Sequence, residues 1–306
     1  MRAGATLPLS SYRADNGAAY ERFLGQWSRL LAGPFIDFAK PPEEGGVLDI
    51  GCGTGSVALV LAERGWRGRT TGIDAAHPYV AFARSRQGTA GIDFTVADAC
   101  RLPYVECSFT AALAQLSLNF VGDAAKAVSE MRRVVCPGGV VAAAVWDFRG
   151  GLVFQRLFWD TAAGLDPAAG AARDRLFSSP LALPDGLPLL WRGAGLATVE
   201  RGSITIRMEY ADFADYWEPL LGGQGPVGSY VLRLPLERRR HLEARVRRAY
   251  LSGAPDGPRS LTATGVGGAR DRTVALLTGK LVSFPPHPEE TSHELERQSR
   301  PCHRRR

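Results

Sequence analysis

Hydrophobic residues follow two different spacings along the first half of the chain. Between residues 17 and 40 they recur every three or four positions, at Tyr20, Phe23, Leu24, Trp27, Leu30 and Leu31. This spacing predicts an amphipathic helix over 17–40, which Pro41 and Pro42 end. Residues 47–50 form a short, mostly apolar segment instead, which predicts a strand.

From residue 47 onward, strand-like and helix-like segments alternate. The further predicted strands are 69–74, 92–98, 109–118 and 140–148, and the predicted helices are 57–65, 75–86 and 123–135. This alternation predicts an α/β fold with a doubly wound, mostly parallel sheet and helices on both faces. Ligands of such sheets bind beyond the carboxyl ends of the strands, so the loop after Ile50 is the first place to search.

The pattern is looser beyond residue 149. It predicts helices between 150 and 190, a strand over 198–210 and a short helix over 211–223. The basic run 233–248 predicts a further helix with a solvated face. Because no long linker separates this half from the first, we interpret 149–264 as part of the same domain, forming a cover over the site.

The segment VLDIGCGTGS places Gly51, Gly53 and Gly55 between a predicted strand and a predicted helix. Glycine permits positive φ and close approach of a ligand, and the N-terminus of the next helix favours an anionic or polar group. A dinucleotide fingerprint requires Gly-x-Gly-x-x-Gly, whereas Ser56 stands where the third glycine belongs. Asp49 would repel a pyrophosphate and suits an ammonium group. The loop therefore favours a ligand without phosphate and disfavours an NAD-dependent oxidoreductase.

Acidic residues also follow the next two predicted strands. Asp74 closes the second strand, where a carboxylate can accept hydrogen bonds from ribose hydroxyls, and Asp98, beside Ala99, follows the third within reach of an adenine edge. Gln115 ends the fourth strand and would line the same cleft. Each acid also has a purely structural explanation, as a helix cap for Asp49 and Asp74 and as a turn residue for Asp98. Their joint placement after successive strands favours S-adenosylmethionine, which has an amine, a carboxylate, a ribose and a purine.

Four segments together resemble the class I S-adenosylmethionine-dependent methyltransferases: VLDIGCGTGS, TGID, DFTVADACRLPYVECSF and VVCPGGVVAAAVW. The likeness is to the small-molecule branch of the ubiquinone/menaquinone-biosynthesis type (methyltransferase type 11), and AAYERFLGQWSRLLAGPFIDF resembles bacterial members of it. The resemblance covers roughly residues 17–148 and implies a seven-stranded Rossmann-like sheet with S-adenosyl-L-methionine as cofactor. It assigns the methionine end to Asp49, Gly51, Gly53, Thr54 and Gly55, the ribose to Asp74 and Ala75, the adenine to Asp98 and Ala99, and the cleft wall to Gln115.

Methyl transfer is an in-line displacement at a carbon already activated by sulfonium, so the protein has to align the reactants and exclude water. A base is required only for a poor nucleophile, and no catalytic residue stands out. We expect His77 at the surface or beside the cofactor, and Tyr20 and Trp27 over the cofactor or in the core. Candidates on the acceptor side are Arg149, Trp159 and Tyr216. The prediction is methyl transfer to a small organic acceptor, with a non-catalytic or impaired cofactor-binding relative as the alternative.

Bulk composition narrows the remaining possibilities. The 306 residues are 45% hydrophobic, no apolar run could span a bilayer, and the N-terminus lacks a secretory signal, so we expect a cytoplasmic protein. Of the formal net charge of +6, half lies in residues 265–306, so nucleic-acid binding is not expected. Histidines and cysteines are dispersed and predict no metal site. The five cysteines are expected to be reduced, mostly buried thiols, since none has CxxC spacing.

The C-terminal segment departs from the family pattern. Members often close with a sequence like Ser-Leu-Thr-Ala-x-Ala-Trp-Ala-Val-Arg-Gly in an antiparallel last strand, whereas SLTAT is followed here by GVGGARDR. One set of codons for GVGGARDR, read one base later, encodes Ala-Trp-Ala-Val-Arg-Gly-Thr. The hypothesis is that 265–306 is a frameshifted, disordered tail and that the last strand is altered. The predicted organisation is a helical segment that caps the cofactor site (1–45), the cofactor-binding core (46–148), the covering half (149–264) and this tail (265–306).

Overall fold

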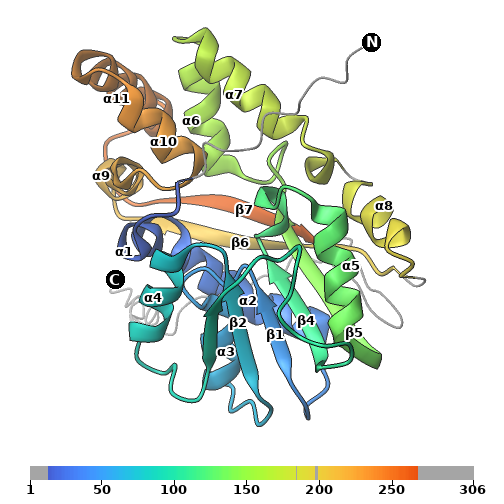
Figure 1. Cartoon of the computed structure of the whole chain (residues 1–306). Coiled ribbons are helices and arrows are strands. Elements are labelled where there is room, and N and C mark those ends of the chain that lie inside the picture. The colour runs from blue at the N-terminus through green and yellow to red at the C-terminus, as the bar shows by residue number, and fades with distance from the viewer. Residues whose placement is uncertain (1–12, 184, 197–198, 268–306) are drawn as a thin grey trace, which may run out of the picture.

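A seven-stranded sheet runs through the molecule, with helices on both of its faces (Figure 1). The computed structural model describes residues 13–267 except 184, 197 and 198. The strand order is β3-β2-β1-β4-β5-β7-β6; β1 to β5 are parallel, and β7 is antiparallel to both of its neighbours. The predicted doubly wound, mostly parallel seven-stranded sheet is therefore confirmed.

The strands lie close to their predicted positions. Their bounds are β1 (Val47–Ile50), β2 (Thr70–Asp74), β3 (Asp93–Val96), β4 (Phe109–Gln115), β5 (Val135–Trp146), β6 (Gly202–Tyr210) and β7 (Arg259–Gly267). The central strands β1 and β4 are buried almost throughout, as expected for strands that are covered on both faces. Because β1 lies between β2 and β4, the carboxyl ends of these three strands are adjacent at one edge of the sheet.

Helices cover the sheet and form a separate layer beyond β6 and β7 (Figure 1). The helices around the parallel strands are α1 (Gly17–Tyr20), the π-helical turn η1 (Glu21–Gly25), α2 (Gln26–Ala39), α3 (Ser56–Glu63), α4 (His77–Ser85), the 3-10 turn η2 (Leu118–Phe120) and α5 (Ala124–Val134). The later helices are α6 (Val153–Ala163), α7 (Pro167–Phe177), the 3-10 turn η3 (Pro180–Ala182), α8 (Gly186–Gly193), α9 (Phe213–Trp217), the 3-10 turn η4 (Glu218–Gly222), α10 (Gly225–Arg233) and α11 (Leu236–Leu251).

Two predicted elements differ from the observed ones. The single helix expected over 17–40 is interrupted by the π turn η1, where the Glu21 carboxylate lies over Gly25. A Cβ atom at Gly25 would lie 2.2 Å from Glu21 Oε2, so only glycine leaves room for this arrangement. The strand expected from residue 140 already begins at Val135, and the pairing of β4 with β5 shifts register between Phe109 and Ala111.

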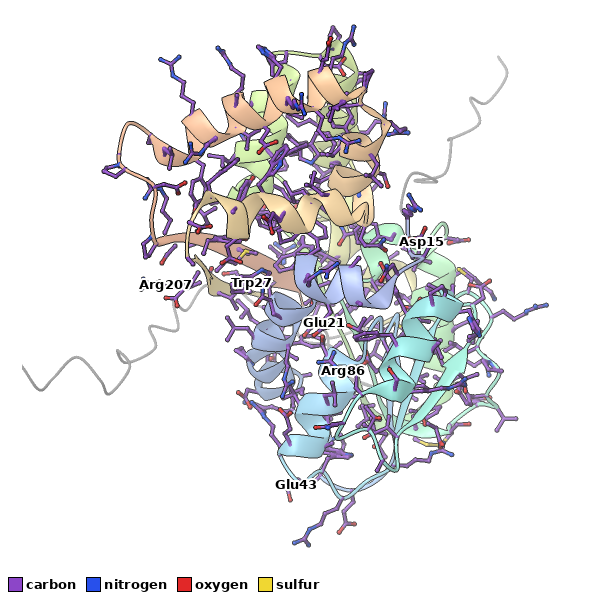
Figure 2. All side chains as sticks on the ribbon, turned by 90° about the vertical axis from the view of Figure 1, so that its left-hand side faces the viewer. Asp15, Glu21, Trp27, Glu43, Arg86 and Arg207 are labelled. Carbon is purple, nitrogen blue, oxygen red and sulfur yellow. A yellow bond between two sulfur atoms is a disulfide. The ribbon has the colours of Figure 1, made fainter. Side chains whose placement is uncertain are left out.

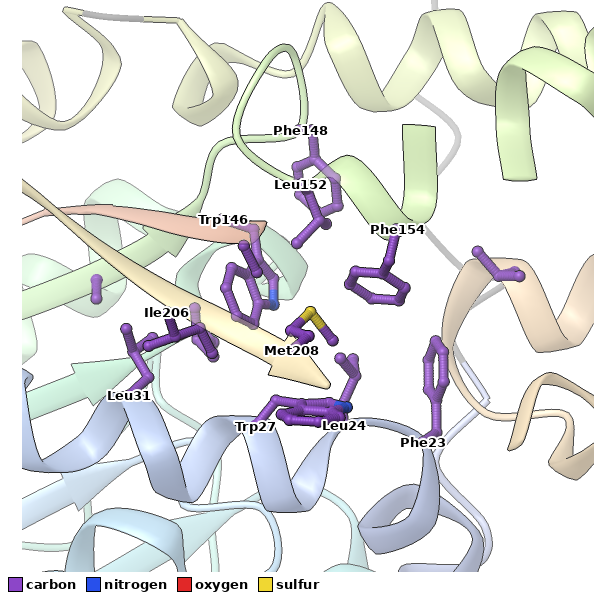
Figure 3. Close-up of a cluster of buried hydrophobic side chains, with 14 of the residues drawn as sticks. Phe23, Leu24, Trp27, Leu31, Trp146, Phe148, Leu152, Phe154, Ile206 and Met208 are labelled. Carbon is purple, nitrogen blue, oxygen red and sulfur yellow. The ribbon is translucent and has the colours of Figure 1, made fainter. Parts of the chain in front are cut away.

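Helix α2 is an integral part of the core (Figure 3). Its residues Trp27 and Leu31, together with Leu24 of η1, lie beside Ile206 and Met208 of β6. Trp146 of β5 and Phe154 of α6 complete the same cluster. A fully buried side chain of this size stabilises the fold by roughly 1.5–3 kcal/mol. The N-terminal segment is therefore held on the sheet by the hydrophobic effect, beside the edge where the site is expected.

The helical layer accounts for two candidate residues in structural terms. Trp159 of α6 is 1% exposed and packs against Tyr230. Tyr216 of α9 is 2% exposed, and its hydroxyl donates a hydrogen bond to the Phe154 carbonyl at 2.8 Å. Both side chains belong to the core of the cover, since each is committed to packing with its neighbours.

Strand β7 extends through Gly267, so residues 265–267 belong to the sheet although the tail was expected to begin at 265. It pairs with β6 over its whole length but with β5 only at Gly265, Val266 and Gly267. The last strand is thus present and antiparallel, as expected for an altered seventh strand. Residues 268–306, the rest of the expected tail, lie outside the described residues.

The expectation that all cysteines are reduced thiols is wrong. Cys107 and Cys136 form a disulfide, whereas Cys52 and Cys100 are free. The two cysteines are 29 positions apart in the chain, so no short-range sequence pattern predicts that they pair. They meet because β4 and β5 are neighbouring parallel strands whose amino-terminal ends lie at the same edge of the sheet.

Candidate functional site

The glycine loop after β1 is bent at three positions where φ is positive, namely Gly51 (+65°), Gly53 (+55°) and Gly55 (+90°). A Cβ atom at Gly51 would lie 2.3 Å from Ser117 Cβ, and one at Gly55 would lie 3.1 Å from the Phe94 ring. A side chain at Gly51 would therefore displace its neighbour, and one at Gly55 would be tightly packed. At Gly53 the nearest atom would be 3.9 Å away, on the Tyr20 ring, so this position has open space in front of it.

Asp74 joins the glycine loop to the end of β2. Its Oδ2 accepts a hydrogen bond from the Gly53 amide at 2.9 Å, and its Oδ1 accepts one from the Ala76 amide at 2.8 Å. Burial raises the pKa of Asp74, and the two amide donors oppose that rise. Each carboxylate oxygen can accept a second hydrogen bond, so Asp74 can hold both the loop and two ligand hydroxyls. The bond to Ala76 fixes the residue that precedes α4, but it does not cap the first turn of that helix.

Asp49 is the most unusual residue at this edge. Its side chain is 1% exposed, and Oδ2 has no hydrogen-bond partner among the described residues. Burial, and secondarily the charge of Asp74, raises the pKa of Asp49 to about 8. Such a carboxylate lacks the cation that would stabilise its charged form. A ligand ammonium group placed here would supply that cation.

Gln115 faces the same side of the sheet as Asp49. Asp49 pairs with Leu113 in the ladder, and Gln115 is two residues further along β4. Its Nε2 donates to the Ser28 carbonyl of α2 at 2.8 Å, while its buried Oε1 has no partner among the described residues. Two uncommitted acceptors therefore face one region, which favours a ligand with hydrogen-bond donors.

Asp98 lies at the same edge but is exposed. The Ala97 amide donates to the Asp74 carbonyl at 3.1 Å, which fixes the chain just before Asp98 beside β2. Asp98 Oδ1 accepts a hydrogen bond from the Cys100 amide at 2.8 Å, so the residue shapes a turn. The half-buried Ala99 follows it directly.

A polar clasp that the sequence did not reveal fixes the N-terminal segment to the glycine loop. It consists of Glu21, Thr54 and Arg86, and Figure 2 shows Glu21 and Arg86 facing each other. Glu21 Oε2 accepts from Thr54 Oγ1 at 2.7 Å and from Arg86 Nη1 at 3.0 Å. Arg86 Nη1 also donates to the Thr54 carbonyl at 3.0 Å. The three residues are far apart in the chain, so no local pattern could predict the clasp.

A second contact ties the same segment to the cover. Gln224, which is 1% exposed, donates through Nε2 to Asp15 Oδ1 at 2.9 Å and accepts at Oε1 from the Tyr79 hydroxyl at 3.1 Å. Tyr20 packs against Tyr79, with ring centroids 4.9 Å apart, and burial raises the pKa of Tyr20 to about 12. Tyr20 thus remains neutral, and its ring lies in front of Gly53.

The clasp carries a testable prediction. Replacing Arg86 with methionine leaves the Glu21 carboxylate without its cation, so we expect faster hydrogen exchange in residues 17–25 and a loss of a few-fold to about tenfold in affinity for S-adenosylmethionine. The control is Arg29→Met, which removes the exposed Arg29–Glu63 ion pair of α2 and should change neither quantity. Equal exchange rates in the two variants would contradict a role for the clasp.

The turn after β4 contains further residues that the sequence analysis missed. Leu116 has a φ of +61°, an uncommon conformation for a residue other than glycine. Ser117 Oγ donates to the Ile50 carbonyl at 2.8 Å, which holds this turn against the glycine loop. Asn119 follows, 5% exposed, and neither atom of its amide has a partner among the described residues. A buried amide without partners at this edge is a second candidate for ligand recognition.

The other candidates lie elsewhere or at the surface. Trp27 packs against Tyr210 in the core, and His77 is exposed at the start of α4. Arg149 is exposed on the loop after β5. Within the described residues no three His, Cys, Asp or Glu side chains are grouped as metal ligands, and no described helix has the length and apolar character needed to cross a membrane.

Gly53 separates a role in folding from a role in binding. Alanine at Gly53 should lower the free energy of unfolding by only about 1 kcal/mol, the cost of a Cβ at positive φ, yet weaken cofactor binding about tenfold or more because the methyl group would fill the open space. Gly65 is the matched control, since its φ is +70° and a Cβ there would meet nothing within 4 Å. Thermal unfolding and binding calorimetry of both variants provide the measurement; equal binding by both would remove Gly53 from the site.

Part of this chain is similar to known proteins. Residues 48–143 match the family model described as a methyltransferase domain. A demethylmenaquinone methyltransferase of Thermus thermophilus is 35% identical over 106 residues, which are 34% of this chain and 48% of that protein. A malonyl-[acyl-carrier protein] O-methyltransferase of Salmonella typhimurium is 40% identical over 96 residues, 31% of this chain and 37% of that protein. The chain thus spans about half, or less, of the length of these curated relatives.

Solved structures agree on the fold. A protein of Anabaena variabilis, assigned as a methyltransferase from an antibiotic biosynthesis pathway, superposes with a TM-score of 0.51. The superposition covers 78% of this chain and 96% of that one at 14% identity, so it supports the shared fold alone. The predicted resemblance to small-molecule methyltransferases is confirmed for the segment that holds the glycine loop, Asp74, Asp98 and Gln115.

Proposed function

We propose, from the methyltransferase domain within residues 48–143, that this protein transfers a methyl group from S-adenosyl-L-methionine to a small organic acceptor by in-line displacement. The observation that carries the proposal is the buried Asp49 carboxylate, whose Oδ2 lacks a partner beside the glycine loop. An amino-acid ammonium group is the partner that this position suits best. A pyrophosphate, as in NAD, would not supply the cation that this carboxylate lacks.

In this proposal each candidate residue has one role. Asp49 holds the ammonium group, with Gln115 Oε1 as a further acceptor. The amides of the glycine loop, from Gly51, Gly53, Thr54 and Gly55, hold the methionine end, and Asp74 with Ala75 holds the ribose. Asp98 and Ala99 contact the adenine. Tyr20 covers Gly53 from the N-terminal segment and keeps water from the site, which favours a reaction that hydration would slow.

The cofactor supplies a methyl group that is already activated. The protein therefore has to position the acceptor and does not have to activate the methyl group. Asn119 bears buried amide atoms without partners among the described residues, and we propose that it orients the acceptor. The two curated relatives have different acceptors in their names, and our proposal therefore extends to a small organic molecule and no further.

Two measurements test the proposal in sequence. Calorimetric titration should show binding of S-adenosylmethionine and S-adenosylhomocysteine but not of NAD, and binding of NAD alone would refute the ligand assignment. Transfer of labelled methyl groups to a panel of phenols, quinols, amines and carboxylic acids should then reveal turnover. Cofactor binding without transfer to any member of a broad panel would favour a non-catalytic relative.

A further inference from the structure

The disulfide between Cys107 and Cys136 lies at the opposite end of β4 and β5 from the glycine loop. Cys107 precedes β4 by two residues, and Cys136 is the second residue of β5. Both line a surface hollow of about 540 Å³ whose other walls come from α5 and from the turn after α8 at Gly195 and Leu196. None of the residues proposed to hold the cofactor lines this hollow.

Cys107 has two features that are typical of a cysteine in a reactive disulfide. The residue is exposed, and its φ of +54° is a backbone conformation that residues other than glycine rarely adopt. Disulfides that are exposed and held by a strained chain are the labile ones, because reduction releases the constraint. The opening of the hollow toward both sulfur-bearing residues gives a reagent access to them.

We propose that this disulfide is a thiol-exchange site for a small anionic thiol. The thiolate of the reagent attacks Cys107 Sγ, a new S–S bond forms, and the bond between Cys107 and Cys136 breaks. Cys136 leaves as a thiolate and takes a proton from water. A second thiol attacks the mixed disulfide and releases Cys107, so two reagent thiols are oxidised to their disulfide while the protein disulfide is reduced to two thiols.

Size and charge of the hollow favour a small thiol over a protein. Its volume is in the range of small-molecule pockets, and the enclosing helix and turn restrict a flat protein surface. Arg132 lines the hollow and donates to the Ala194 carbonyl at 2.9 Å, and it forms no ion pair among the described residues. Arg133 is paired with Glu130, and Glu106 also lines the hollow. The Arg132 guanidinium can therefore form an ion pair with a carboxylate of the thiol reagent.

The test uses the full-length folded protein without cofactor, so its outcome is independent of the proposed methyl transfer. Glutathione is added, thiols are trapped, and peptides are analysed by mass spectrometry without reduction. We expect a glutathionyl group on Cys107, followed by free thiols at both positions, while the buried Cys52 stays unmodified. The Cys100→Ser variant should behave identically, because the half-buried Cys100 is not part of the site.

Four results would overturn the proposal. The first is free thiols at Cys107 and Cys136 in the protein as isolated under air, and the second is a disulfide that resists glutathione until denaturant is added. The third is modification at Cys100 in place of Cys107. The fourth is reduction of the disulfide only by a protein dithiol such as reduced thioredoxin. The charge assignment has its own control in Arg132→Gln, which should slow the reaction with glutathione at least about threefold but leave that with neutral 2-mercaptoethanol unchanged. Unchanged glutathione rates in this variant would refute the anionic class.

Discussion

Replacing Asp74 with alanine is expected to weaken S-adenosylmethionine binding by about 100-fold or more. The carboxylate makes two charge-assisted hydrogen bonds to the amides of Gly53 and Ala76, and we propose that it accepts two more from the ribose. Losing hydrogen bonds to a charged group costs roughly 1.5–3 kcal/mol each, so loss of the ribose contacts alone accounts for the effect. Release of the Gly53 amide would add to the loss by loosening the loop.

Two further variants make the Asp74 experiment specific. Asp74→Asn retains one acceptor oxygen, so its affinity should lie between those of the wild type and the alanine variant. Asp93→Ala, an exposed acid at the start of β3, removes the same charge and should leave affinity unchanged. Calorimetric titration at constant pH and salt measures all three. Wild-type affinity in Asp74→Ala, with folding verified by circular dichroism, would exclude Asp74 from the cofactor site.

Replacing Asp49 with asparagine is expected to stabilise the free protein while weakening cofactor binding. The pKa of Asp49 is about 8 in the folded protein against 3.8 in the unfolded chain, because burial disfavours its charge. Between these values the unfolded chain loses a proton that the folded protein keeps, so stability falls as pH rises from about 4 to 8. At pH 7 the penalty is roughly 4 kcal/mol, and asparagine, which does not titrate, would remove most of it.

The same residue links binding to pH. Below pH 8 an ammonium ligand must displace the proton of Asp49, so binding at pH 7 should release up to one proton and affinity should rise as pH approaches 8. Calorimetry in buffers of different ionisation enthalpy measures this release. Asp49→Asn should show no such release from this site and should bind about tenfold to 100-fold more weakly. The assignment would be contradicted if the unfolding free energy of the wild type rose between pH 5 and 8 relative to that of Asp49→Asn. Normal cofactor binding by Asp49→Asn would contradict it as well.

If Asp49→Asn raises stability and weakens cofactor binding, the side chain of Asp49 serves binding and not folding. A carboxylate that only capped the next helix would lower stability when removed, since the cap would be lost. The structural and functional explanations of Asp49 therefore predict opposite signs for one measurement. Asp93→Asn is again the control, because an exposed carboxylate should change neither quantity by more than about 0.5 kcal/mol.

Local sequence patterns predict the order and type of the elements around the glycine loop. Short, largely apolar segments alternate with segments that have a periodic apolar face, so local patterns were sufficient for β1, β2 and α5. The alternating glycines before Ser56 and the acids after successive strands also marked the candidate site, because parallel strands bring their carboxyl ends together. The start of β5 was misplaced, since Pro137 and its following glycines conceal a strand that tertiary pairing maintains.

Contacts between residues that are distant in the chain depend on the three-dimensional fold. The clasp of Glu21, Thr54 and Arg86 joins three segments that are separate in the chain. The missing partner of Asp49 is visible only when its whole surroundings are known. The pairing of Cys107 with Cys136 depends on the adjacency of β4 and β5. Hydrophobic periodicity is a property of neighbours in sequence, whereas hydrogen bonds, ion pairs and disulfides form between neighbours in space, and that difference separates what could be predicted from what could not.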